Sequence, residues 1–141
     1  MDAIVQAKRV LEIFKEMSQI PRGSGNEKGI SDYIVNFAHN LGLEATQDSE
    51  WNVVIKKPAT PGYENRPSVI LQGHIDMVCV KGHDSSHDFT KDPIANIIEG
   101  EWMHADHTTL GADNGMGAAM MLALLEDESQ QHGPMQLLFT T

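Results

Sequence analysis

The 141-residue sequence is poor in cysteine, in aromatic residues and in long apolar runs. Its one cysteine, Cys79, cannot form a disulfide within the chain, so a reducing compartment is expected. No apolar run approaches the roughly 20 residues that a membrane-spanning helix requires. The N-terminus also lacks the basic, then apolar, then small-residue order of a signal peptide. These absences predict a cytoplasmic protein with no membrane partner.

Basic residues are also scarce: 10 lysines and arginines stand against 20 acids, which gives a formal net charge of −10. This charge argues against nucleic acid as a partner and fits attraction of cations. An acidic surface that only maintains solubility is the alternative for most of the carboxylates. With 40% hydrophobic residues, the chain can form a folded core and is expected to be one domain.

Three segments have the apolar spacing of helices. The first has one buried stripe, and the third is apolar almost all round, which is typical of a buried helix. Ser24 and Glu27 form the pattern of a capping box before the second helix, and Gly42 is expected to end it. The apolar positions are Ile4, Ala7, Val10, Leu11, Phe14 and Met17 in the first helix, Ile30, Tyr33, Ile34, Phe37, Ala38 and Leu41 in the second, and Met116, Met120, Met121, Leu122, Leu124 and Leu125 in the third.

Strands are predicted where the apolar period changes, with polar or proline-rich loops between them. The segment 68–77 begins apolar on both faces, which is expected of a strand covered on both sides. Helices that alternate with strands over longer crossovers favour a layered α/β domain. The predicted strands are residues 43–47, 52–56, 68–77 and 135–141, with short strand-like pieces in 94–104 and loops at 58–67 and 82–93.

Two short motifs place imidazole and carboxylate side chains at the ends of these elements. His74 and Asp76 stand two residues apart at the end of a strand, so their side chains are expected to face the same side. Asp113 lies in a glycine-flanked turn directly before a helix, and Thr140 ends another strand. Ligands gather at the carboxyl ends of strands in open α/β sheets, and histidine and aspartate side chains are typical zinc ligands. A structural His–Asp pair is the alternative, and two protein ligands are too few to close a metal site.

On these motifs the chain resembles the N-terminal part of the bacterial aminoacyl-histidine dipeptidases. These enzymes belong to the co-catalytic dizinc peptidases, which include carnosinases and aminotripeptidases. The matching stretches are residues 20–27 (IPRGSGNE), 73–78 (GHIDMV) and 108–115 (TTLGADNG), while 88–94 (DFTKDPI) favours the aminoacyl-histidine branch. The resemblance implies a three-layer α/β/α fold with a mostly parallel central sheet, of which residues 1–141 would form the N-terminal portion.

The resemblance also assigns roles to the candidate site residues. His74 would ligate one metal ion and Asp113 would bridge two, while Asp76 would be a catalytic residue that sets the orientation and basicity of a ligand imidazole. Asn114 would share the turn, where relatives often have a cis peptide bond. The cofactor would be zinc, two ions per complete site, or other divalent metals. A bridging carboxylate screens the repulsion between two cations while a shared hydroxide becomes the nucleophile.

Some residues depart from the family pattern or fall outside it. Relatives usually carry glycine in place of His107, which is expected to be an exposed loop residue, with a stray metal contact as the alternative. His83 and His87 are spaced i, i+4, but the polar sequence around them favours a loop. Cys79 is interpreted as a small buried hydrophobe. Beyond residue 141 we expect the family's acidic pair, which supplies the general base and a ligand. We also expect the distal histidine ligand and the lid or dimerisation domain of the family there.

The resemblance therefore implies metal-dependent hydrolysis of Xaa-His dipeptides such as β-alanyl-histidine, with the isolated chain inactive for lack of the general base. A dipeptide substrate would be the partner, and the full-length protein would be a homodimer. One alternative is a non-catalytic truncated fragment that only folds or binds a partner. Another is a different hydrolase of the family, such as an aminotripeptidase or an amino-acid deacylase.

Overall fold

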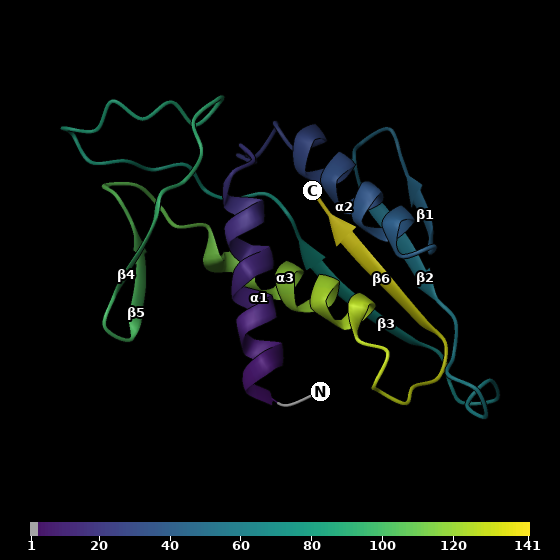
Figure 1. Cartoon of the computed structure of the whole chain (residues 1–141). Helices are drawn as coiled ribbons and strands as arrows, with labels where there is room; N and C mark the ends of the chain where they lie inside the picture. The colour runs from purple at the N-terminus through teal and green to yellow at the C-terminus, as the bar shows by residue number, and fades with distance from the viewer. Residues whose placement is uncertain (1–2) are drawn as a thin grey trace.

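Residues 3–141, which the computed structural model describes, form three helices and six strands (Figure 1). The predicted helices and strands are present, with bounds that differ by a few residues. None of the described helices is both long and apolar enough to cross a lipid bilayer. The elements are α1 (Ala3–Ser18), α2 (Lys28–Asn40), β1 (Glu44–Gln47), β2 (Val53–Lys57), β3 (Val69–His74), β4 (Asn96–Glu99), β5 (Trp102–Ala105), α3 (Ala112–Glu126) and β6 (Met135–Thr140).

Four strands form one sheet in the order β1-β2-β6-β3, and β4 pairs with β5 in a separate hairpin. Among residues 3–141, only β3 and β6 are parallel neighbours, because β1 with β2 and β2 with β6 are antiparallel. The α/β class is confirmed, but the expectation of a mostly parallel sheet is wrong for this part of the chain. The reason lies partly in connectivity. Residues 48–52 are too short a link for a parallel crossover, whereas α3 provides one between β3 and β6.

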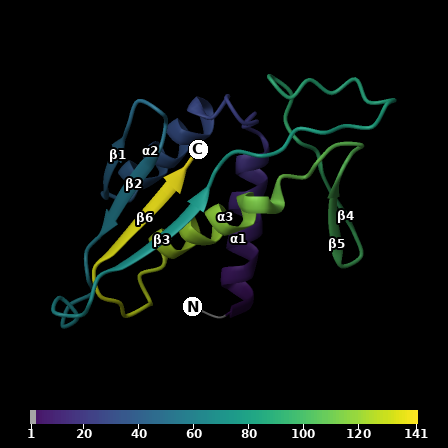
Figure 2. The same cartoon turned by 180° about the vertical axis from the view of Figure 1, so that it is seen from behind.

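The helices lie on one side of the sheet, where α2 and α3 pack against the strands and α1 packs against α3. In Figure 1 the helices lie in front of the strands, and Figure 2 shows the strands in front of the helices. Val53, Ile55, Leu137 and Phe139 are fully buried in the core between the sheet and the helices. The described residues therefore form two layers, and the second helical layer implied by the resemblance is not among residues 3–141.

The uncovered face explains part of the difference between β3 and its prediction. Ile70 is 63% exposed on that face, whereas Val69, at the start of the strand, is 49% exposed on the opposite face, although the apolar start of this strand predicted cover on both faces. β3 is also the edge strand of the sheet, with β6 beside it. An apolar strand sequence indicates which faces can be buried, whereas the packing of other elements decides which of them are.

The C-terminus of α2 follows its prediction, whereas the N-terminus contradicts its prediction. Gly42 has a φ of 72°, and its amide bonds back to the last turn of the helix, so the predicted glycine C-terminus is confirmed. Ser24 does not cap the helix, because Glu27 occupies the N-cap position with no side-chain cap bond. The Glu27 carboxylate accepts a hydrogen bond from the Gly25 amide at 2.6 Å, and the Ser24 hydroxyl bonds to Asp76 instead. The capping-box prediction is therefore wrong.

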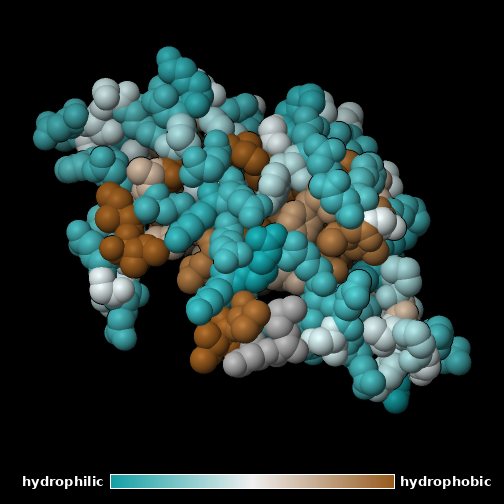
Figure 3. Space-filling view, in the orientation of Figure 1, coloured by the Kyte–Doolittle hydropathy of each residue, from teal (hydrophilic) through white to brown (hydrophobic). Residues whose placement is uncertain are grey.

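Residues 78–109 leave the sheet as an excursion that contains the polar loop and the β4–β5 hairpin (Figure 1). The excursion is tied to α1 where the Ile94 amide donates to the Ser18 carbonyl at 2.8 Å. Beyond this tie, Ile98 and Trp102 of the hairpin are 54% and 79% exposed. Figure 3 shows apolar side chains at the surface on the side of the molecule where this hairpin lies.

Candidate metal centre

The candidate site lies at the carboxyl ends of the two parallel strands. His74 is the last residue of β3 and pairs in register with Thr140 of β6. The Ile75 amide continues this pairing by donating to the Thr140 carbonyl at 2.8 Å. Because parallel strands end at the same edge of a sheet, the segments that follow them meet there.

His74 and Asp76 contact each other directly. The Nδ1 atom of His74 lies 2.8 Å from Oδ1 of Asp76. Side chains two residues apart in an extended segment face the same side, which is why the spacing predicted this contact. The bond to Nδ1 leaves the other ring nitrogen, Nε2, to face a third group, and it determines which tautomer of His74 is favoured.

Asp113 approaches His74 from the start of α3. Its Oδ1 atom lies 3.1 Å from Nε2 of His74, and its side chain is 97% exposed. Asp113 and Asn114 have non-helical backbone angles, so the regular helix begins after them. The peptide bond between them is cis, as the resemblance implied. The structure thus brings together the three site residues that were named from the sequence.

Ser24 is a further site residue, which the sequence interpretation missed. Its hydroxyl donates to Oδ2 of Asp76, the oxygen that does not bond to His74. Both carboxylate oxygens of Asp76 therefore have partners, and a chain of hydrogen bonds connects Ser24, Asp76, His74 and Asp113. The serine was visible in the motif at residues 20–27, but its role was attributed to a helix cap.

Burial and hydrogen bonding shift the pKa values of His74 and Asp76 in opposite directions. Burial lowers the pKa of His74, but its hydrogen bonds to Asp76 and Asp113 outweigh burial and raise the pKa overall. Burial raises the pKa of Asp76, but its hydrogen bonds with Ser24 and His74 outweigh burial and lower the pKa. Asp76 is therefore a carboxylate at neutral pH, which is the form that can orient the imidazole.

Asn114 occupies a space that two glycines leave open. A Cβ atom on Gly73 of β3 or on Gly117 of α3 would overlap the Asn114 side chain. The absence of a Cβ lets the strand and the helix approach on either side of Asn114. This close approach brings the start of α3, and with it Asp113, to the end of β3.

These side chains suit a divalent cation as part of a larger site. A cation can replace the proton between Nε2 of His74 and the Asp113 carboxylate, because both groups are zinc ligands. A carboxylate on the other ring nitrogen, here Asp76, is the usual partner of a ligating histidine. Within residues 3–141, no group of three or more His, Cys, Asp or Glu side chains could hold a metal ion. The described residues thus bring together two candidate ligands, His74 and Asp113, fewer than the three protein ligands of a catalytic zinc ion.

The other residues singled out from the sequence lie in the excursion. His107 has a side chain that is 72% exposed and a φ of 53°, a backbone conformation that favours glycine. Glycine is the residue expected at this position in relatives. His83 and His87 lie in the loop of the same excursion, where no regular secondary structure forms. Cys79 is exposed, so its interpretation as a buried residue is wrong, because the chain leaves the core shortly after β3.

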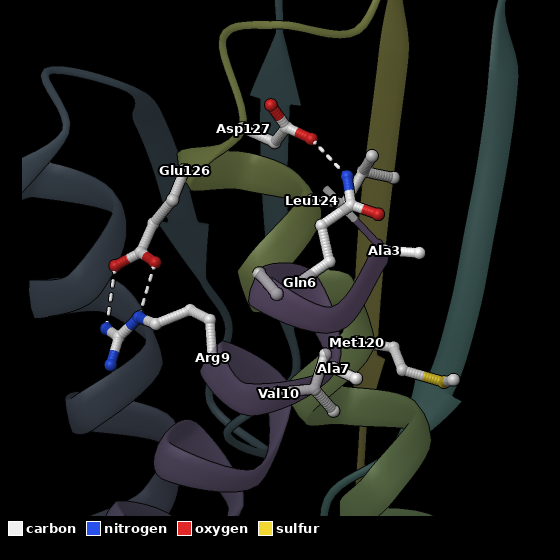
Figure 4. A pocket seen from close by; sticks show the side chains of 10 residues that line it. Ala3, Gln6, Ala7, Arg9, Val10, Met120, Leu124, Glu126 and Asp127 are labelled. Carbon is white, nitrogen blue, oxygen red and sulfur yellow. Dashed lines mark hydrogen bonds and ion pairs between the residues drawn. The ribbon is translucent and has the colours of Figure 1, made fainter. Parts of the chain in front are cut away.

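A hollow of about 350 Å³ lies between α1 and the C-terminal half of α3, at the end of that helix remote from Asp113. Figure 4 shows Arg9 and Glu126 beside it, joined by two hydrogen bonds of 2.7 and 2.8 Å. Gln6 similarly bonds to Asp127 at 2.6 Å. These contacts join the two helices, and the hollow is separate from the His74–Asp113 pair.

The fold and the site together define an α/β domain of the kind found in peptidase catalytic domains. No family model matches the chain. Its sequence is 50% identical over 129 residues to the cytosol non-specific dipeptidase of Escherichia coli, a match that covers 92% of this chain and 27% of that protein.

Solved structures give the same result. The aminoacylhistidine dipeptidase of Vibrio alginolyticus matches with a TM-score of 0.89 and 47% identity, over 93% of this chain and 27% of that chain. A tripeptidase of Staphylococcus aureus matches with a TM-score of 0.76 and 26% identity, over 95% of this chain and 36% of that one. The predicted resemblance to the aminoacyl-histidine dipeptidases is confirmed, and the chain spans about a quarter of the length of the dipeptidases that it matches.

Proposed function

We propose that this chain provides the N-terminal part of a metal-dependent dipeptidase site, in which His74 ligates one zinc ion and Asp113 bridges two. The observation that carries the proposal is the arrangement around His74. Its Nδ1 bonds to Asp76 at 2.8 Å, while its Nε2 faces the Asp113 carboxylate at 3.1 Å. Similarity to two dipeptidases at about half identity supports peptide-bond hydrolysis.

Each residue has a distinct task in this proposal. A bound divalent metal would supply Lewis-acid polarisation of the scissile carbonyl and lower the pKa of the attacking water. Asp76 keeps the proton of His74 on Nδ1, so that Nε2 presents its lone pair as a ligand. Ser24 holds the second oxygen of Asp76 and prevents the carboxylate from rotating away. Asp113 presents an exposed carboxylate that would hold both cations.

The general base, the remaining ligands and a lid or dimerisation domain are proposed to come from sequence outside residues 1–141. The proposal is supported by the share of the relatives that the chain spans, 27% in both dipeptidases. For the full-length protein we expect a homodimer. We also expect a cytoplasmic location, in keeping with the E. coli relative, which is named as a cytosol enzyme.

Xaa-His dipeptides are the proposed substrates, in keeping with the Vibrio aminoacylhistidine dipeptidase. The similarity to a staphylococcal tripeptidase makes tripeptide hydrolysis the second candidate. The test compares kcat/KM of the full-length protein for β-alanyl-histidine, a tripeptide and an acylated amino acid. We expect the highest value for β-alanyl-histidine, and a higher value for either of the others would contradict the substrate assignment.

Assays of the isolated 141-residue chain test how much of the proposed metal site it contains. With His74 and Asp113 as ligands and no general base, it should not hydrolyse β-alanyl-histidine, and calorimetry should detect only weak zinc binding. Turnover that a chelator abolishes and that His74→Ala removes would contradict this expectation. A full-length protein that neither binds zinc nor hydrolyses peptides would instead favour a non-catalytic role.

A further inference from the structure

Arg22 is a fully enclosed arginine that pairs with no carboxylate in the described residues. It is 2% exposed, and its guanidinium donates to backbone carbonyl groups. Nη1 lies 3.1 Å from the carbonyl oxygen of Ile75 and 3.5 Å from that of Asp76, and Nη2 lies 2.7 Å from the carbonyl oxygen of Gly111. Burial lowers the pKa of Arg22, with the charge of Asp76 opposing it. Removing a cation from water is costly, so its position requires a structural reason.

The carbonyl groups that Arg22 binds belong to the two segments of the candidate metal centre. Ile75 lies between His74 and Asp76, directly after β3. Gly111 is the N-cap residue of α3 and precedes Asp113 by two positions. One guanidinium thus connects the segment of the proposed histidine ligand to the segment of the proposed bridging carboxylate.

The glycines on both sides of Asp113 leave room for this guanidinium. A Cβ atom on Gly111 would lie 2.6 Å from Nη2 of Arg22, and one on Gly115 would lie 2.5 Å from the same atom. Gly111 also has a positive φ of 77°, but Gly115 does not, so its need for glycine is one of space. The Gly-Ala-Asp-Asn-Gly segment therefore forms a turn and also packs around the buried side chain of Arg22.

The contacts of the Asp113 side chain are too few to fix its position. The side chain is 97% exposed, and within residues 3–141 its hydrogen-bond partner is the His74 ring. Its location therefore depends on the backbone at the start of α3, where the Gly111 carbonyl accepts bonds both from the Gly115 amide at 3.1 Å and from Arg22. On the other side, His74 is held by β3 and by Asp76.

We propose that Arg22 is a positioning residue of the metal centre, whose planar guanidinium holds the His74–Asp76 segment and the Asp113 turn at the separation that a shared metal requires. The donors of arginine have a rigid, forked geometry, so one side chain can bind two carbonyl groups in fixed directions. A lysine keeps the charge but has a single nitrogen, and it cannot reproduce both bonds. The role in metal binding rests on the proposed function, whereas the connection between the two segments does not.

The first experiment measures the connection without metal, by hydrogen–deuterium exchange of the full-length protein. Arg22→Met retains the length of the side chain, Arg22→Lys retains the charge, and Arg9→Met is the matched control. Arg9 also joins two elements, α1 and α3, but it does so through Glu126 at the far end of α3 (Figure 4). The readout is the exchange rate of residues 74–77 and 111–115 relative to that of the sheet.

In Arg22→Met, exchange in both segments should accelerate about tenfold or more relative to the sheet, because hydrogen bonds to a charged donor are lost there. Arg22→Lys should show a smaller acceleration, and Arg9→Met should leave both segments within about twofold of the parent. If Arg22→Met does not fold, the comparison rests on Arg22→Lys. Exchange within twofold of the parent in both segments of the folded Arg22 variants would overturn the proposal.

The second experiment measures zinc affinity of the same proteins by competition with a chelator. We expect Arg22→Met to weaken zinc binding about 10- to 100-fold, the loss typical of residues that support ligands, and Arg9→Met to change it less than twofold. If the parent binds zinc and the Arg22 variants bind it equally well, the positioning role is overturned. If the parent binds no zinc while the exchange result holds, the proposed function fails and the connection through Arg22 remains.

Discussion

The segments around the candidate metal centre and the β4–β5 hairpin both lie outside the main sheet, yet they are held very differently. Around the site, Ile75 and Met77 are 0% and 3% exposed, and Arg22 is buried beneath them. In the hairpin, Ile98 and Trp102 are 54% and 79% exposed. The difference shows that regular secondary structure is a poor guide to burial here. The irregular segments beside His74 and Asp113 are supported by buried contacts, whereas the regular hairpin exposes its large apolar side chains.

The largest effect is expected at Asp113. In the full-length protein, Asp113→Ala should remove bound metal and activity together, because this carboxylate would bridge both cations. Asp106→Ala is the matched control, since Asp106 is an exposed acid of the excursion, and it should leave both unchanged. The measurement is zinc per subunit beside the rate constant. Retention of two zinc ions in Asp113→Ala would refute the bridging role.

Asp76→Ala should separate metal binding from activity. Asp76 bonds to His74 and makes no metal bond in this proposal, so some metal should remain while activity falls. Loss of such a supporting carboxylate typically costs about 10- to 100-fold in metal affinity or activity. The same two measurements apply. Near-normal turnover in Asp76→Ala would mean that the contact with His74 has no catalytic consequence.

Ser24→Ala should have a smaller effect on activity than Asp76→Ala. The substitution removes one hydrogen bond to Asp76 but leaves the bond between Asp76 and His74 in place. We expect a loss of about tenfold or less in kcat, and Ser24→Thr should recover most of it because the hydroxyl is retained. Equal losses in the alanine and threonine variants would indicate that packing, rather than the hydrogen bond, matters at this position.

The smallest effect is expected in the hairpin. Because Trp102 is 79% exposed, Trp102→Ala should change the free energy of unfolding by less than about 0.5 kcal/mol. Leu137→Ala, in the fully buried core, should lower it by about 2–5 kcal/mol. Urea denaturation measures both. A large loss in Trp102→Ala would show that the hairpin is a stabilising part of the fold and would remove the contrast with the site.

Local sequence patterns were sufficient wherever neighbouring residues decide the outcome. Gly42 ends α2 with a positive φ, as expected of a glycine after a helix. The helix and strand positions follow from apolar spacing, which depends on residues only a few positions apart. The patterns failed where packing between residues far apart in the sequence decides the outcome. Ile70 is exposed because no element in residues 3–141 covers its face of the sheet, and Ser24 leaves its predicted cap for a carboxylate 52 residues away.

The sequence by itself determined the contact between His74 and Asp76, because residues two positions apart on one extended segment face the same side. It also identified Asp113 as a candidate from its glycine-flanked turn. Only the tertiary structure decided that Asp113 meets His74 at 3.1 Å, and that Arg22 binds both of their segments from beneath. These contacts join residues 39 to 89 positions apart, and no local spacing encodes such a distance, since it depends on how β3, β6 and α3 pack together.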